Sequence, residues 1–74
     1  MDYHHYFYDA DANLVAQLLD TDIEMNVGDA VLISQQKSIY RIEAILHIPG
    51  AAVNIYPWLV SRLSKPQVTS WSLI

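Results

Sequence analysis

The chain has 74 residues, no cysteine and a formal net charge of −4 at pH 7. This length predicts one small domain, residues 1–74, without a separate catalytic lobe. Charged residues make up 16% of the sequence against a usual share of about 25%, so part of the surface is uncharged or apolar, which favours self-association. No apolar run reaches the length of a membrane span and the first residues do not resemble a signal peptide, so we expect a cytoplasmic protein without membrane contact.

The charged residues are unevenly distributed. Residues 1–29 contain seven Asp or Glu and no Lys or Arg, whereas residues 30–74 contain one acid and four basic residues, so the two segments carry −7 and +3. Such asymmetry is typical of a partner-binding face or a self-complementary dimer, unless folding brings the segments together and neutralises them locally. Four scattered cations provide few phosphate contacts, so a basic protein is a better expected partner than a nucleic acid.

The first third of the chain predicts a β-hairpin. Residues 3–8 are aromatic-rich, as half-buried strands are, and residues 9–13 are turn formers. Residues 14–19 fit either a second strand or one face of a short helix. The strand is preferred because Asp20 and Asp22 close the apolar run early.

The central part of the chain predicts two further strands. Residues 27–29 form a turn that opens a strand over 30–34, and residues 35–37 make a short polar connection. Residues 38–48 alternate with period two, which is typical of a long strand with one mostly apolar face. That face consists of Tyr40, Ile42, Ala44, Leu46 and Ile48.

Two prolines divide the rest of the sequence. Residues 49–50 (Pro-Gly) predict a turn before a strand over 52–56. Pro57 cannot donate to a ladder, so it ends that strand, sits on an edge, or begins a short helical turn over 58–63. Residues 66–74 form an extended final strand or a tail.

Together these elements predict an all-β protein, or a β-rich one with one short helix. Five or six short strands with hairpin connections form a small antiparallel barrel or a curled sheet. The spacing of residues 27–33, 40–48 and 53–56 resembles that of SH3-like small β-barrel proteins. The resemblance rests on spacing, so it implies a fold and no function.

One segment has a metal-like pattern. Asp9, Asp11 and Asn13 match the first three ligand positions of a calcium loop. However, Leu14 replaces the glycine that the sharp turn of such a loop needs, and Asp20 stands where a bidentate Glu belongs. We therefore expect a turn here and no bound metal.

The remaining polar residues do not form a catalytic or cofactor pattern. His4 and His5 face opposite sides of a strand, and His47 is remote in sequence. Arg41 and Glu43 on one strand face predict a surface ion pair. No nucleophile motif or glycine-rich phosphate loop is present, so neither an enzyme nor a cofactor is expected.

The aromatic residues of the second half are candidates for an interface. Tyr56 and Trp58 lie on one face of an extended segment near Arg62, and these three residue types are enriched at interface hot spots. Alternatively, Trp58 is the largest core side chain. Trp71 lies in the uncharged segment 68–74, which either closes its own sheet or pairs with an edge strand of another chain.

Two functions are compatible with these features. The first is a small non-enzymatic protein-interaction module that self-associates as a homodimer. Its contact residues are Tyr56, Trp58, Arg62 and Trp71.

The alternative is an acidic inhibitor or nucleic-acid mimic, of the kind that phages and mobile elements encode, which binds a basic groove of a protein. Carboxylates that share one face and are not paired with Arg or Lys would favour it. Its contact residues are Asp9, Asp11, Asp20 and Asp22.

Overall fold

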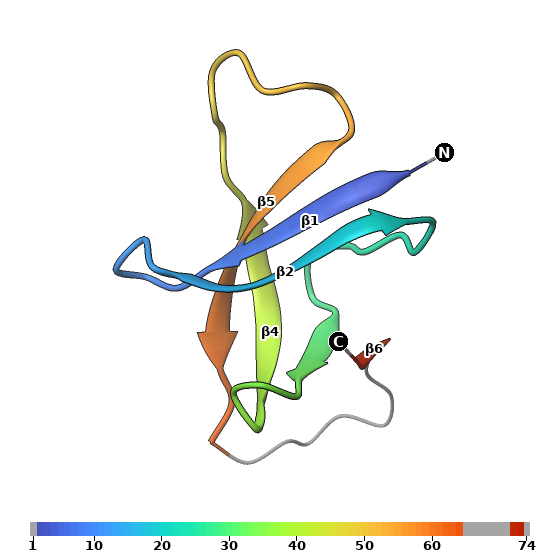
Figure 1. Ribbon diagram of the computed structural model, residues 1–74. Helices are drawn as coiled ribbons and strands as arrows, with labels where there is room; N and C mark the ends of the chain where they lie inside the picture. Colours follow the sequence, from blue (N-terminus) through green and yellow to red (C-terminus); the bar gives the residue numbers. More distant parts are fainter. Residues whose placement is uncertain (1, 65–71, 74) are drawn as a thin grey trace.

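The computed structural model describes residues 2–64 and 72–73 and shows one six-stranded sheet in the order β2-β1-β5-β4-β3-β6 (Figure 1). The sheet curls through 233° into a half-barrel, and the described residues contain no helix. The predicted all-β curled sheet is therefore confirmed. The strands are β1 (Tyr3–Tyr8), β2 (Leu14–Thr21), β3 (Ala30–Ile33), β4 (Ser38–Ile45), β5 (Ile55–Arg62) and β6 (Ser72–Leu73).

The N-terminal hairpin forms as predicted. β1 and β2 are antiparallel, with Phe7 opposite Ala16, so residues 14–19 are strand and not helix. The turn is closed by Asp9, whose Oδ1 accepts hydrogen bonds from the backbone N–H of Asp11 (2.9 Å) and of Asn13 (3.0 Å). One carboxylate oxygen of Asp9 is thus engaged in holding the turn.

A turn with a left-handed glycine leads into β3, also as predicted. Gly28 has a φ of 98°, a conformation that side chains disfavour. Its N–H donates to the carbonyl of Ile42 (2.8 Å), and the Ile42 N–H donates to the carbonyl of Asp29 (2.9 Å). These bonds join the turn to β4 and align the antiparallel pair β3–β4.

β4 is shorter than the alternation predicts. The pattern holds at Tyr40 and Ile42, which are buried, and then the register with β5 shifts between Ile42 and Ala44. The strand ends at Ile45, and Ile48 is 45% exposed. The expected continuous strand over 38–48 is therefore wrong at its end, although the alternation of more buried and exposed side chains continues through the bulge to Leu46.

The predicted boundaries of the next strand are also wrong. β5 begins at Ile55 and runs through Pro57 to Arg62, so no helical turn follows the proline. The Asn54 carbonyl bonds to β1, whereas the Pro57 carbonyl accepts from the Leu46 N–H (2.7 Å), so the Pro57 backbone faces β4. β4 ends at Ile45, so the missing N–H of Pro57 falls at the end of the β4–β5 ladder and not in its middle.

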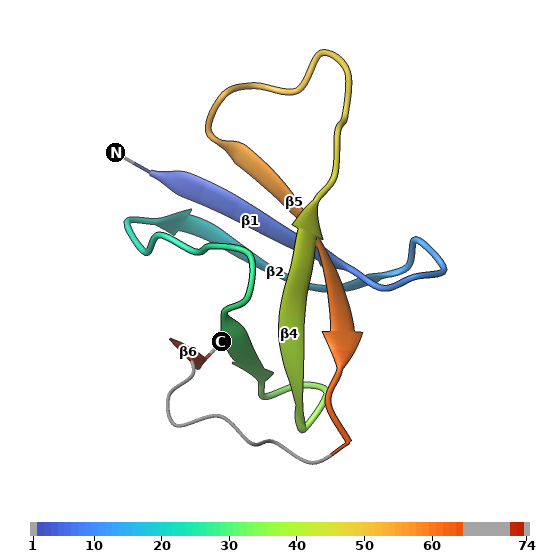
Figure 2. The ribbon, with the colours of Figure 1, turned by 180° about the vertical axis from the view of Figure 1, so that it is seen from behind.

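The two halves of the curled sheet share strand β5. Its residues 55–59 pair in parallel with β1, and its residues 58–62 pair antiparallel with β4, as Figure 2 shows from behind. Of the five strand pairings, β1–β5 and β3–β6 are parallel, so the sheet is mixed rather than purely antiparallel. Of the C-terminal segment, the structure describes Ser72–Leu73, which pair with β3.

The core lies on the concave face of the sheet and is small. Its buried side chains come from β1, the segment before β3, β3, β4 and β5, so no strand pair forms a core of its own. Within the described part of the chain, no buried side-chain nitrogen or oxygen lacks a hydrogen-bond partner. The core residues are Phe7, Met25, Val31, Ile33, Tyr40, Ile42, Trp58 and Val60.

No helix among the described residues is long and apolar enough to cross a membrane.

Two isoleucines of β4 provide a test of this core. Ile42 is 0% exposed and Ile45 is 52% exposed. We predict that Ile42→Val lowers the free energy of unfolding by about 1 kcal/mol, because it removes a buried methylene, whereas Ile45→Val lowers it by less than about 0.5 kcal/mol. Urea denaturation of both variants measures the difference. Equal losses would contradict the placement of Ile42 in the core.

Candidate binding cleft

The parallel pairing of β1 with β5 gathers aromatic rings on the concave face. It sets His5 beside Tyr56 and Phe7 beside Trp58. The ring centroids of His5 and Tyr56 are 5.5 Å apart, and those of Tyr56 and Trp58 are 6.0 Å apart with planes 12° from parallel. At the open end of this row, the Tyr3 ring meets the Tyr56 ring at 68° with centroids 5.5 Å apart. Such offset and tilted pairs are the favoured arrangements of aromatic side chains.

His5 is the polar centre of the row and is 1% exposed. The Trp58 indole N–H donates to His5 Nδ1 (2.9 Å), and His5 Nε2 lies 2.8 Å from the carbonyl oxygen of Ile23. An indole N–H can only donate and a carbonyl can only accept. Nδ1 therefore carries no proton, Nε2 carries one, and the ring is neutral.

The same hydrogen bond fixes the segment that carries Glu24. This segment connects β2 to β3 and contains no regular strand. Its backbone is held by His5 at Ile23, and the Met25 side chain is buried in the core at 6% exposed. Glu24 lies between these two anchors, so its backbone is positioned by groups on either side of it.

A cleft of about 230 Å³ opens between this segment and the aromatic row. Tyr3 and Tyr56, both half-buried, line it together with Glu24. The Tyr3 hydroxyl donates to Glu24 Oε1 (3.2 Å). This hydrogen bond and the negative charge of Glu24 raise the pKa of Tyr3 above its ordinary value of 10.0. The described residues that line the cleft are Tyr3, His5, Glu24, Met25, Asn26 and Tyr56.

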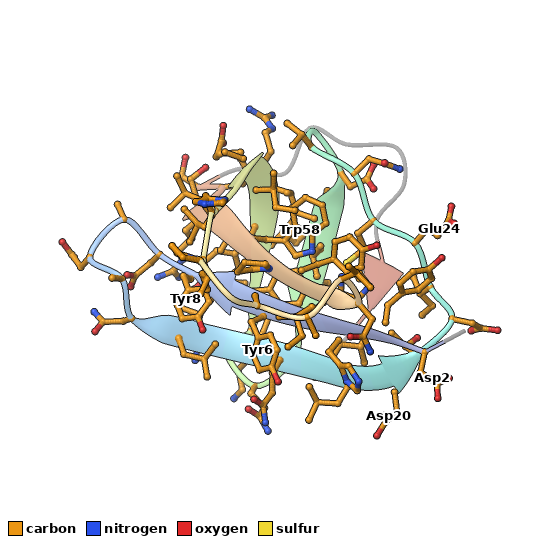
Figure 3. The ribbon with its side chains drawn as sticks, turned by 90° about the horizontal axis from the view of Figure 1, so that it is seen from above. Asp2, Tyr6, Tyr8, Asp20, Glu24 and Trp58 are labelled. Atoms are coloured by element: carbon orange, nitrogen blue, oxygen red, sulfur yellow. The ribbon has the colours of Figure 1, made fainter. Side chains whose placement is uncertain are left out.

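Acidic side chains surround this end of the hairpin. Figure 3 shows Asp2, Asp20 and Glu24 together at one end of β1 and β2, with Tyr8 at the other end. Asp20 Oδ1 lies 3.7 Å from His4 Nε2. Within residues 2–64, no Asp or Glu forms an ion pair with Lys or Arg. Local neutralisation of the acidic segment by the basic one is not seen in this part of the chain, and Glu43 bonds to Ser61 rather than to Arg41.

The aromatic interface residues predicted from the sequence are not together. Tyr56 lines the cleft, whereas Trp58 lies beneath it in the core at 5% exposed, which agrees with its alternative reading as a core side chain. Arg62 lies at the other end of β5, in a groove with Lys37. Trp71 lies outside the described residues.

The predicted acidic residues divide between the two ends of the β1–β2 hairpin. Asp9 and Asp11 are at the turn, whereas Asp20 and Asp22 are at the end of β2 and just beyond it, and Asp20 lies against His4 rather than in the cleft. Of the cleft residues, sequence reasoning identified Tyr56 and missed Tyr3, His5, Glu24, Met25 and Asn26. Their only signal was an aromatic strand in the same segment as the acids, because nothing local indicates that β1 pairs with β5.

The cleft combines aromatic rings with one carboxylate. It offers two tyrosine rings and one exposed carboxylate above a neutral histidine. Among the described residues, no group of three or more His, Cys, Asp or Glu is arranged to hold a metal ion. No family model matches this chain, and comparison with curated proteins and with solved structures gives no match either.

The Tyr3–Glu24 contact predicts a change in an ionisation constant. Replacing Glu24 with Gln removes the charge that opposes ionisation of Tyr3, so the Tyr3 pKa falls towards 10.0. A pH titration followed by NMR of ¹³C-labelled tyrosine measures it. Glu43→Gln, which removes a carboxylate outside the cleft, leaves the Tyr3 pKa where it is. The pKa of Tyr3 is higher in the folded protein than in the unfolded chain. The contact with Glu24 therefore stabilises the fold below about pH 10, and this stabilisation is lost as the pH rises through the Tyr3 pKa of the folded protein.

The hydrogen bonds of His5 predict its tautomer. Long-range ¹H–¹⁵N NMR near neutral pH should show a protonated Nε2 and an unprotonated Nδ1 for His5. In Trp58→Phe, the Nδ1 signal should move because its donor is lost. A protonated Nδ1 in the native protein would contradict the His5–Trp58 bond.

Proposed function

We propose that this protein is a small non-enzymatic interaction module that binds a basic segment of another protein at the acidic end of its β1–β2 hairpin. One observation carries the proposal: carboxylates without Lys or Arg partners in the described part of the chain share one end of the hairpin, and one of them, Glu24, lines a preformed aromatic cleft there. Charges left unpaired at a surface attract a partner of opposite charge and speed its association.

The positions of the carboxylates along the hairpin indicate how long a basic segment of the partner can be. Asp9 and Asp11 are separated from Asp20 and Asp22 by the length of the β1–β2 hairpin. A nucleic-acid mimic that fills a long basic groove would place its carboxylates along one continuous face. A cluster of carboxylates at one end of the hairpin suits a short basic segment better. Of the acidic inhibitor and the nucleic-acid mimic, we therefore favour an inhibitor or adaptor that binds such a segment.

Self-association is a second candidate with its own support. β2 is the terminal strand of the sheet and carries two exposed leucines, Leu14 at 49% and Leu19 at 42%. An exposed edge with apolar side chains can pair with another strand. In addition, the groove with Lys37 and Arg62 shares no described lining residue with the cleft, so a second copy could bring its basic groove to the acidic end of the first.

We further propose that the curled sheet is SH3-like at the level of fold and that the protein works in the cytoplasm. The antiparallel succession β3–β4–β5 falls on the stretch whose spacing resembles SH3-like barrels, which supports the first point. The lack of cysteine fits a reducing compartment and supports the second.

Salt and charge variants test the interaction proposal. A lysine-rich peptide should bind at about 50 mM salt and lose most of its affinity at about 500 mM, as calorimetry would measure, because salt screens exposed charges. The double variant Asp20→Asn, Asp22→Asn should weaken binding about fivefold. Asn at position 20 also suits the left-handed φ of 54° found there.

The matched control is Asp11→Asn with Glu43→Gln, which removes the same charge away from the cleft. It should change the affinity less than about twofold. Equal losses in the two double variants would contradict a localised acidic site. Light scattering in the same two buffers tests self-association, because a dimer that persists in both would favour the β2 edge, and one lost in high salt would favour the charged ends.

A further inference from the structure

We propose that the cleft between Tyr3, Tyr56 and Glu24 takes a single arginine side chain of the basic partner. This inference rests on the proposed function and adds the identity of the group that enters the cleft. It depends on the shape, the charge and the size of the cleft.

The two tyrosine rings form a corner that suits a cation. They meet at 68° with centroids 5.5 Å apart, and both line the cleft. The face of an aromatic ring carries negative potential and attracts a cation within about 6 Å of its centroid. A planar guanidinium stacks on such a face better than a compact ammonium does.

Glu24 supplies the counter-charge at the rim. Its Oε1 accepts one hydrogen bond from Tyr3, and a carboxylate can accept about four, so it retains capacity for a guanidinium. The anchors at Ile23 and Met25 hold its backbone before any ligand arrives. A prepositioned carboxylate loses little freedom on binding.

The floor and walls of the cleft do not repel a cation. No Lys or Arg among the described residues lines it, and His5 is neutral because it accepts from Trp58 and donates to the Ile23 carbonyl. Both ring nitrogens of His5 are engaged, so the floor neither adds a positive charge nor competes for Glu24.

The volume limits the ligand to one side chain. Pockets for drug-sized ligands measure about 300–1,000 Å³, and this cleft measures about 230 Å³. A nucleotide or a folded element would not fit in it, whereas the end of an arginine side chain would.

The probes are three short peptides that differ at one position. Each has a lysine at both ends and glycines around a central arginine, lysine or citrulline. The arginine and lysine peptides have equal charge, and citrulline keeps the shape of arginine without its charge. We expect the arginine peptide to bind at least about threefold more tightly than the other two at about 50 mM salt. Its binding should shift the NMR signals of the Tyr3 and Tyr56 rings.

Cleft variants test whether that preference arises here. Glu24→Gln and Tyr56→Leu should each abolish the preference for arginine over lysine, whereas Tyr56→Phe, which keeps the ring, and Glu43→Gln should retain it. Because Tyr56 also packs against the core, Tyr3→Leu serves as a second ring deletion, with Tyr3→Phe as its control.

The outcomes separate the two proposals. If the arginine and lysine peptides bind native protein equally, or if the preference survives in both Glu24→Gln and Tyr3→Leu, the arginine site is refuted while binding of a basic partner stands. If none of the peptides binds at low salt, both proposals are refuted.

Discussion

The hydrogen bond from Trp58 to His5 is the interaction on which both the fold and the cleft depend. It joins β5 to β1 in the core across 53 residues of sequence. β5 is the strand shared by the two halves of the sheet, and this bond lies where its pairing passes from β1 to β4. Two buried polar groups that hydrogen-bond to each other cost the fold little stability. Loss of either group would leave the other without a partner, which would lower the stability by about 1–3 kcal/mol. The bond therefore specifies one parallel register among those that apolar contacts alone would allow.

The second hydrogen bond of His5 extends this constraint to the surface. Nε2 holds the Ile23 carbonyl, and the buried Met25 side chain holds the segment on the other side of Glu24. A core contact thereby positions the exposed carboxylate of Glu24. Tyr3, at the start of β1, is positioned by the pairing of β1 with β5. The cleft consequently belongs to the folded core and does not require a mobile loop to close. Its rings and carboxylate are in place before a ligand binds, which lowers the entropic cost of recognition.

The sequence predicted those parts of the fold that local chemistry determines. The hairpin follows from aromatic residues, turn formers and an early stop at Asp20, and the turn before β3 follows from Gly28. Pro57 misled the prediction of where β5 ends, because the cost of a proline within a strand depends on where the neighbouring strand ends. That position is set by the tertiary structure and not by the local sequence. Likewise, β4 ends at Ile45, where its pairing with β5 ends, although the sequence alternates as far as Ile48. Of the cleft, only Tyr56 was identified, since the meeting of Tyr3, His5 and Glu24 requires the register of a parallel pair that is remote in sequence.

Unpaired acidic groups have a cost in a domain of this size. Seven Asp or Glu in residues 1–29 repel one another, and a small domain has only about 5–15 kcal/mol of stability to offset such repulsion. Pairing them with the basic residues of the second segment would have relieved it, yet within residues 2–64 the fold keeps Lys37 and Arg62 in a separate groove. Hydrogen bonding engages part of the acidic set: Asp9 closes the hairpin and Asp29 accepts from the Asn26 N–H (2.8 Å). Turn chemistry thus accounts for those two carboxylates but not for Asp20, Asp22 and Glu24, which lie at the end of the β1–β2 hairpin remote from its turn. A basic partner would relieve the repulsion at that end, so binding and stability would be coupled there.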